Sequence, residues 1–154
     1  MKQKRFLGWY VLLFSFLFLF DRVTKFLMIQ SEQIKIKIAP FLSFELSFNR
    51  GISWGLFSSA QTSIFVLVSL MTVAVIIPLF IYAFLRWRSG FSVWGETVAL
   101  AGALSNLVDR VFYGGVVDFI SVSYGWFSWP VFNVADICIV VGIFFVLLGF
   151  YKEG

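Results

Sequence analysis

The 154-residue sequence contains no histidine and a single cysteine, Cys138. The absence of histidine excludes Ser-His and Cys-His catalysis, the two-histidine zinc motif and any histidine-based proton relay. One cysteine cannot form an internal disulfide, and it argues against a cysteine-based metal site. Any acid–base chemistry at this protein's site therefore has to come mainly from its carboxylates.

Charge is also scarce. Charged residues make up 13% of the chain and hydrophobic residues 60%, whereas a soluble globular domain has about 25% charged residues. The formal net charge is +4, but the cations lie mainly at the ends of apolar runs, which is typical of membrane topology rather than of nucleic-acid binding. We expect one membrane domain over residues 1–154 and no nucleic-acid partner.

Four apolar segments are long enough to cross a bilayer, for which roughly 20 residues are needed. They cover about 6–29, 61–85, 93–113 and 131–151. The first is not followed by a small-residue cleavage site, so we interpret it as an uncleaved span rather than a secretory signal. Because helices satisfy their own backbone hydrogen bonds in lipid, we predict an all-α integral membrane protein with four transmembrane helices.

The short basic segments predict the orientation of these spans. Cations precede the first span, join the second to the third and follow the fourth, at Lys2, Lys4, Arg5, Arg86, Arg88 and Lys152. The positive-inside rule makes this side cytoplasmic, with both termini inside. The opposite connection, about 30–57, contains two alternating runs, 34–38 and 44–48, which predict a small extracytoplasmic antiparallel β-sheet (a cradle) between helices 1 and 2.

Polar residues gather at one depth, near the outer ends of the spans. Three spans and the outer connections contribute to this layer, with Asp21, Lys25, Asn49, Gly51, Asn106, Asp109, Arg110, Asp118, Asn133 and Asp136. Ionisable groups within membrane spans are costly and are usually functional. We therefore place the candidate site at the outer face of the membrane.

Several of these residues also have a purely structural interpretation. Asp21 and Lys25 are four residues apart on one helical face and are suited to an ion pair that fixes packing. Asp109 and Arg110 fit an interfacial anchor pair, and Asn49 to Gly51 fit a turn. Asn106 and Asn133 fit a supporting role as hydrogen-bond donors to the site.

Asp118 and Asp136 are harder to explain as structural residues. Asp118 lies in a connecting loop, in the apolar run Val116–Ile120, and Asp136 lies in the apolar run 132–137, with no cation adjacent in either sequence. Carboxylates in apolar surroundings have raised pKa values, and two that lie close together can share one proton. Aspartic proteases use this arrangement. That the two groups meet is an inference from their shared depth.

Five segments resemble, in order, motifs of the bacterial prolipoprotein signal peptidases (signal peptidase II, lipoprotein signal peptidase). Asp21–Lys25 resembles D-x-x-T-K, and Asn49–Gly55 is similar to N-x-G-x-A-F-G. Ala101–Arg110 resembles G-G-A-x-G-N-x-x-D-R. Val116–Phe119 and Phe132–Asp136 match V-x-D-F and F-N-x-A-D. The departures are Ser53 and Trp54 for Ala and Phe, and Ala101 and Ser105 for glycine.

This resemblance implies an aspartic endopeptidase that cleaves prolipoproteins before a diacylglyceryl-modified cysteine. Asp118 and Asp136 would be the catalytic pair, and the other polar residues of the layer would support the pair and bind substrate. It further implies location in the bacterial inner membrane, contact with membrane lipids, sensitivity to globomycin and no metal or organic cofactor. We expect a monomer.

Two other classes of function remain open at this stage. A proton-coupled small membrane transporter would also place carboxylates in spans, but such sites usually lie near the midplane between internal repeats. A membrane scaffold gives no reason for two isolated aspartates at matched depth.

Overall fold

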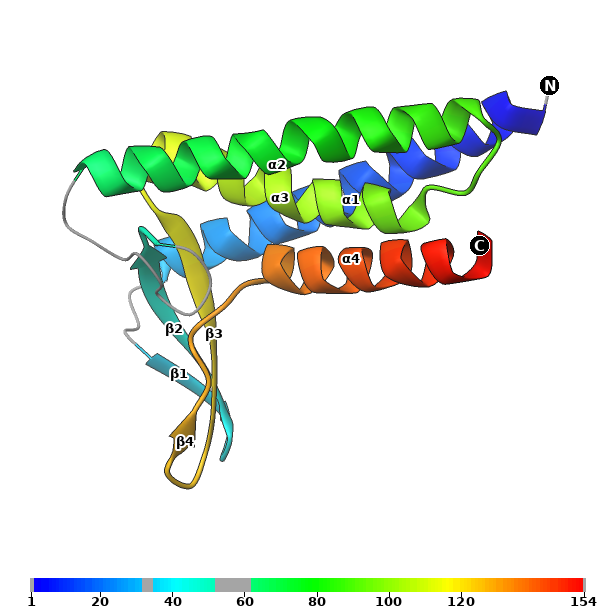
Figure 1. Cartoon of the computed structure of the whole chain (residues 1–154). Helices are drawn as coiled ribbons and strands as arrows, with labels where there is room; N and C mark the ends of the chain where they lie inside the picture. The colour runs from blue at the N-terminus through cyan, green and yellow to red at the C-terminus, as the bar shows by residue number, and fades with distance from the viewer. Residues whose placement is uncertain (1, 32–34, 52–61, 154) are drawn as a thin grey trace.

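The computed structural model describes residues 2–31, 35–51 and 62–153 (Figure 1). Residues 52–55 of the second motif, including Ser53 and Trp54, lie outside the described part of the chain. The elements are α1 (Lys2–Gln30), β1 (Lys35–Ala39), β2 (Leu42–Asn49), α2 (Thr62–Arg88), α3 (Trp94–Tyr113), β3 (Val116–Tyr124), β4 (Phe127–Ser128) and α4 (Val134–Glu153).

The four helices run alongside one another, and the sheet extends from one end of this bundle (Figure 1). Their bounds agree closely with the four predicted apolar segments. Within the described residues, α2 is long and apolar enough to cross a membrane by length and composition, and Val134–Gly149 of α4 is a shorter apolar helix. Many large apolar side chains of α2, among them Leu70, Val75 and Phe80, are exposed in the isolated chain, as expected of a surface that faces lipid.

Helix α3 is the centre of the bundle, because it contacts each of the other three helices and packs most extensively on α4. Small residues permit this close approach. A Cβ atom added at Gly102 would collide with the carbonyl oxygen of Ala135, and one added at Gly142 would collide with the backbone of Ala99. Small residues of this kind are typical of helix contacts in membranes. The packing fixes α3 and the beginning of α4 against each other, where the polar residues lie.

Helix α3 ends at Gly114, whose φ of 66° is the left-handed conformation that favours glycine after a helix. The chain then enters β3. The sheet has the order β1-β2-β3-β4 with antiparallel neighbours, and in it Ser47 of β2 lies opposite Asp118 of β3.

The predicted sheet was incomplete in one respect. Its first two strands lie between α1 and α2, as expected, but β3 and β4 come from the connection between α3 and α4. Asp118 therefore lies in a strand rather than in a loop. The run Val116–Val122 is rich in β-branched and aromatic residues, which favour strands, and this signal was available in the sequence.

Candidate active site

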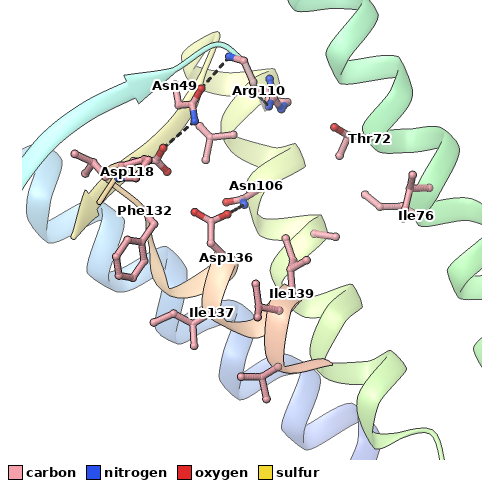
Figure 2. Close-up of a pocket in the computed structure, with 18 of the residues that line it drawn as sticks. Asn49, Thr72, Ile76, Asn106, Arg110, Asp118, Phe132, Asp136, Ile137 and Ile139 are labelled. Carbon is pink, nitrogen blue, oxygen red and sulfur yellow. Dashed lines mark hydrogen bonds between the residues drawn. The ribbon is translucent and has the colours of Figure 1, made fainter. Parts of the chain in front are cut away.

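Asp118 and Asp136 line the same cavity, whose volume is about 540 Å³ (Figure 2). Asp118 comes from the third residue of β3, and Asp136 from the first turn of α4. The other polar side chains that line the cavity include those of Asn49, Asn106 and Arg110. The structure thus brings together two aspartates that are 18 positions apart in the sequence.

Asp118 is 3% exposed and accepts two amide hydrogen bonds. The Nδ2 atom of Asn49 lies 3.1 Å from its Oδ2 atom, and the Nδ2 atom of Asn133 lies 2.7 Å from its Oδ1 atom. Burial raises the pKa of Asp118 to about 7, and the nearby Asp136 carboxylate adds to the rise, while the two amides and the charge of Lys25 oppose it. Asp118 therefore holds its proton to a higher pH than an ordinary aspartate does.

Asp136 is held at the start of α4 by a reciprocal capping arrangement. Its main-chain N–H donates to Oδ1 of Asn133 at 2.8 Å, and its own Oδ2 accepts the main-chain N–H of Asn133 at 3.2 Å. This is the geometry of a capping box, with Asn and Asp in the two roles. The second carboxylate oxygen, Oδ1, accepts a hydrogen bond from Nδ2 of Asn106 at 2.8 Å (Figure 2).

Asn133 connects the two aspartates. Its side-chain amide donates to Asp118 and its main-chain N–H donates to Asp136, and the residue is fully buried. Neither aspartate forms an ion pair with another described residue, as the sequence predicts. One asparagine therefore fixes the orientation of both carboxylates.

A cluster of charges lies beside this pair. The Nζ atom of Lys25 lies 2.7 Å from Oδ2 of Asp21 and 2.7 Å from Oδ2 of Asp109, and all three side chains are buried. Arg22 also pairs with Asp109. The predicted ion pair of Asp21 and Lys25 is present, but it is part of a larger cluster that joins α1 to α3.

The two carboxylates of the cluster also hold the main chain next to each site aspartate. Oδ1 of Asp21 accepts the N–H of Ala135 at 2.7 Å. Oδ2 of Asp109 accepts the N–H of Val117 at 3.1 Å. Ala135 precedes Asp136 and Val117 precedes Asp118, so the cluster braces both segments that carry the pair.

Arg110 holds the segment that follows β2. Its guanidinium donates to the carbonyl oxygens of Arg50 and Gly51, while Oδ1 of Asn49 accepts the N–H of Gly51 at 2.9 Å. The predicted turn at Asn49–Gly51 is therefore present, and Asn49 uses its amide group both for this turn and for Asp118. Asp109 and Arg110, interpreted from the sequence as a pair of anchors, have separate partners: Asp109 pairs with Lys25 and Arg22, and Arg110 donates to the main chain after β2.

The cavity continues as an apolar groove beyond the polar group. Its walls come from α2 and α4, with Val75, Ile76, Ile137, Ile139, Val140 and Val141 (Figure 2). Helix α2 packs chiefly on α3 rather than on α4, and the exposed fraction of Val140 is 68%. The aspartates thus lie at the polar end of a groove that is otherwise suited to lipid or an apolar helix.

All ten residues predicted for the site lie in or directly beside this arrangement. Two further residues contribute that were not predicted as site residues. Arg22 donates to Asp109, and the hydroxyl of Ser105 donates to Asp21 at 2.6 Å. Arg22 could have been found from its position beside Asp21 in the first motif. Among the described residues, no group of three or more histidine, cysteine, aspartate or glutamate side chains is arranged to hold a metal ion.

Comparisons with known proteins identify the family to which this chain is similar. Residues 13–152 match the model of the family described as signal peptidase (SPase) II. The lipoprotein signal peptidase of Staphylococcus aureus (strain MRSA252) is 30% identical over 158 residues, covering 99% of this chain and 94% of that protein. Its counterpart from strain JH9 is 29% identical over the same extent.

Two solved structures, both described as a bacterial membrane enzyme studied by the in meso method, are similar to this fold. One superposes with a TM-score of 0.73 at 28% identity and covers 96% of this chain and 90% of its own. The other has a TM-score of 0.73 at 25% identity and covers 97% and 96%. The likeness therefore includes the sheet as well as the helices.

Proposed function

Because the chain belongs to the signal peptidase II family, we propose that it is an aspartic endopeptidase that removes the signal peptide from bacterial prolipoproteins. Cleavage occurs before the cysteine that carries a diacylglyceryl group. Asp118 and Asp136 are the catalytic pair. The observation that carries this proposal is the pair of hydrogen bonds by which Asn133 holds both carboxylates in one cavity.

The pair acts on a peptide bond with one shared proton. The ionised carboxylate takes a proton from water as the water oxygen attacks the carbonyl carbon, and the protonated carboxylic acid gives its proton to the carbonyl oxygen. A tetrahedral diol results. The pair then moves a proton from the diol to the departing amide nitrogen, the C–N bond breaks, and the pair is left again with one proton.

The surrounding residues suit this chemistry. Asn49, Asn106 and Asn133 donate to the two carboxylates, which fixes their orientation without adding a second titrating group. A pKa of about 7 for Asp118 keeps one proton available at neutral pH. Arg110 holds the main chain of Arg50 and Gly51, and Gly51 lines the cavity, where it can contact the substrate chain.

The apolar groove matches the chemistry of the substrate. A prolipoprotein brings an apolar signal helix and two acyl chains, and the side chains that α2 and α4 contribute beyond Asp136 are apolar except for Thr72. Globomycin, a lipophilic cyclic peptide, is expected to inhibit by entering the same cavity.

All four helices are proposed to span the bacterial inner membrane, with both termini cytoplasmic and the aspartates near the outer face. The apolar exposure of α2 and α4 supports this placement, and so do Arg86 and Arg88 at the end of α2 away from the cavity. At this depth the site meets both lipid-held substrate and water. The position of the aspartates, with Asp136 in the first turn of α4, also disfavours the transporter alternative, whose site is expected near the midplane.

The test is cleavage of a purified diacylglyceryl-modified prolipoprotein by the purified protein in detergent or lipid. Mass spectrometry of the products should show a mature chain that begins with the modified cysteine. A cut at another bond, or no cut by a folded protein, would overturn the proposal.

A further inference from the structure

Ser105 is a fully buried hydroxyl in the middle of α3. Its Oγ atom lies 2.6 Å from Oδ2 of Asp21 on α1. Other hydroxyls within the helices behave differently, since those of Ser69, Thr72 and Thr97 each bond to the carbonyl four residues earlier. That local bond is the usual one for a hydroxyl inside a helix. The hydroxyl of Ser105 is directed instead to a carboxylate on another helix.

The two carboxylate oxygens of Asp21 have different hydrogen-bond partners. Oδ1 accepts the main-chain N–H of Ala135 at 2.7 Å, whereas Oδ2 receives both Ser105 and Lys25. Lys25 is shared, because its Nζ atom also lies within 2.8 Å of Asp109 and Asn106. The Ser105 hydroxyl can donate one hydrogen bond, and Asp21 Oδ2 accepts it. This bond fixes the rotation of the carboxylate that directs Oδ1 at Ala135.

Ala135 is fully buried and directly precedes Asp136. Its N–H belongs to the first turn of α4, where backbone donors have no partner within the helix. Asp21 therefore caps α4 from a neighbouring helix, one residue before the aspartate of the pair. A change in the direction of the Asp21 carboxylate would shift this turn, and with it the Asp136 carboxylate. Displacements of about 1 Å in a catalytic group can lower rates by about 10²-fold.

We propose that Ser105 is a positioning residue for Asp136, acting through Asp21 and the main chain of Ala135. The proposal rests on the proposed role of Asp136 in cleavage. Ser105 is one of the positions at which the sequence departs from the third motif. The proposal predicts that the hydroxyl affects the chemical step more than substrate binding.

The first test compares Ser105→Ala and Ser105→Cys with the wild-type protein, using cleavage of a lipidated prolipoprotein. Alanine removes the donor, and cysteine keeps a weak donor of similar size. We expect kcat to fall about 5- to 20-fold for alanine and less for cysteine, with KM within about twofold in both. Thr97→Val is the matched control, because Thr97 is a buried hydroxyl at the other end of α3; its kcat should stay at the wild-type value.

The second test repeats Ser105→Ala in an Asp21→Asn background. If Ser105 acts through Asp21, the serine change should lower kcat little further there, because coupled residues are not additive. The proposal would be overturned if Ser105→Ala kept the wild-type kcat. It would also be overturned if Ser105→Ala lowered kcat as much in the Asp21→Asn background as in the wild type, or if Thr97→Val lowered kcat as much as Ser105→Ala. If Ser105→Ala or Asp21→Asn does not fold, a kcat equal to wild type in Ser105→Cys overturns it and a lowered kcat at unchanged KM supports it. A wild-type protein that cleaves no prolipoprotein would instead refute the proposed function.

Discussion

The Nζ atom of Lys25 lies 2.8 Å from the side-chain oxygen of Asn106. Asn106 in turn donates its Nδ2 to Asp136 at 2.8 Å, so one amide joins the charge cluster of α1 to the proposed catalytic pair. The lysine fixes which end of the Asn106 amide faces Asp136, because a cation cannot accept a hydrogen bond. A residue outside the reacting pair thereby sets the hydrogen bonding within it.

The first prediction concerns the pair itself. Asp118→Asn and Asp136→Asn should each lower kcat by about 10²- to 10⁴-fold or more, because each removes a group that must transfer a proton. Cleavage of a lipidated prolipoprotein by the purified variants checks this, with thermal unfolding as evidence of folding. Glu45→Gln is the matched control, since Glu45 is an exposed carboxylate on β2 that pairs with Lys35. Wild-type activity in either folded aspartate variant would refute the catalytic pair.

The second prediction is the pH dependence of the rate. The pKa of Asp118 is raised to about 7, and the pair needs one proton to protonate the carbonyl oxygen. As the pH rises through about 7 that proton is lost, so kcat/KM should fall by up to about tenfold per pH unit on the alkaline side. The measured value belongs to the coupled pair rather than to one residue. A rate that stays constant from pH 6 to pH 9 would contradict this assignment.

The raised pKa of Asp118 also makes the folded protein less stable as the pH rises. Between the ordinary value of 3.8 and about 7, the folded chain holds a proton on Asp118 that the unfolded chain has released. This contribution to stability is complete below about 4 and is lost as the pH rises to about 7, at up to about 1.4 kcal/mol per pH unit. Unfolding of wild type and Asp118→Asn across this range should differ in slope. Parallel pH profiles would count against a raised pKa.

The sequence predicted the helices and the gathering of the polar residues in one region, for identifiable reasons. The bounds of α1 to α4 follow four long apolar runs in the sequence, and runs of this length are expected to be helical. The depth of Asp21, Asn106 and Asp136 along those runs was enough to place them in one layer. Such arguments depend on helical rise alone, which varies little.

Lateral contacts were predicted less well. Asp109 pairs with Lys25, whereas Arg110 donates to Gly51. These partners depend on how α1 and β2 pack around α3, and the spacing of residues in the sequence does not predict that packing. The same holds for Ser105, whose partner is 84 positions away. The strand that contains Asp118 could have been predicted, because its β-branched residues are evident in the sequence. The short apolar run was nevertheless assigned to a loop.

A fourth prediction concerns Lys25. Lys25→Met keeps an unbranched apolar stem but leaves the buried carboxylates of Asp21 and Asp109 without their shared cation. Breaking a buried ion pair in this way costs about 3–5 kcal/mol, so the midpoint of thermal unfolding in detergent should fall markedly. Lys37→Met, at an exposed position of β1, is the control and should unfold like wild type. If Lys25→Met loses stability while the folded fraction keeps its full kcat, the role of Lys25 is structural alone.

The last prediction concerns the lipid on the substrate. The groove beyond the aspartates is lined by Val75, Ile76, Val140 and Val141. Acyl chains that are already in lipid gain little hydrophobic energy by entering it, so we expect these walls to act by positioning the chains and, with them, the modified cysteine. A precursor without the diacylglyceryl group lacks this positioning, so its kcat/KM should be lower by about 10²-fold. The measurement is cleavage of one precursor prepared with and without the modification, at equal concentration in the same lipid. Because the peptide sequence is identical, equal cleavage of the two forms would show that the groove does not recognise the lipid.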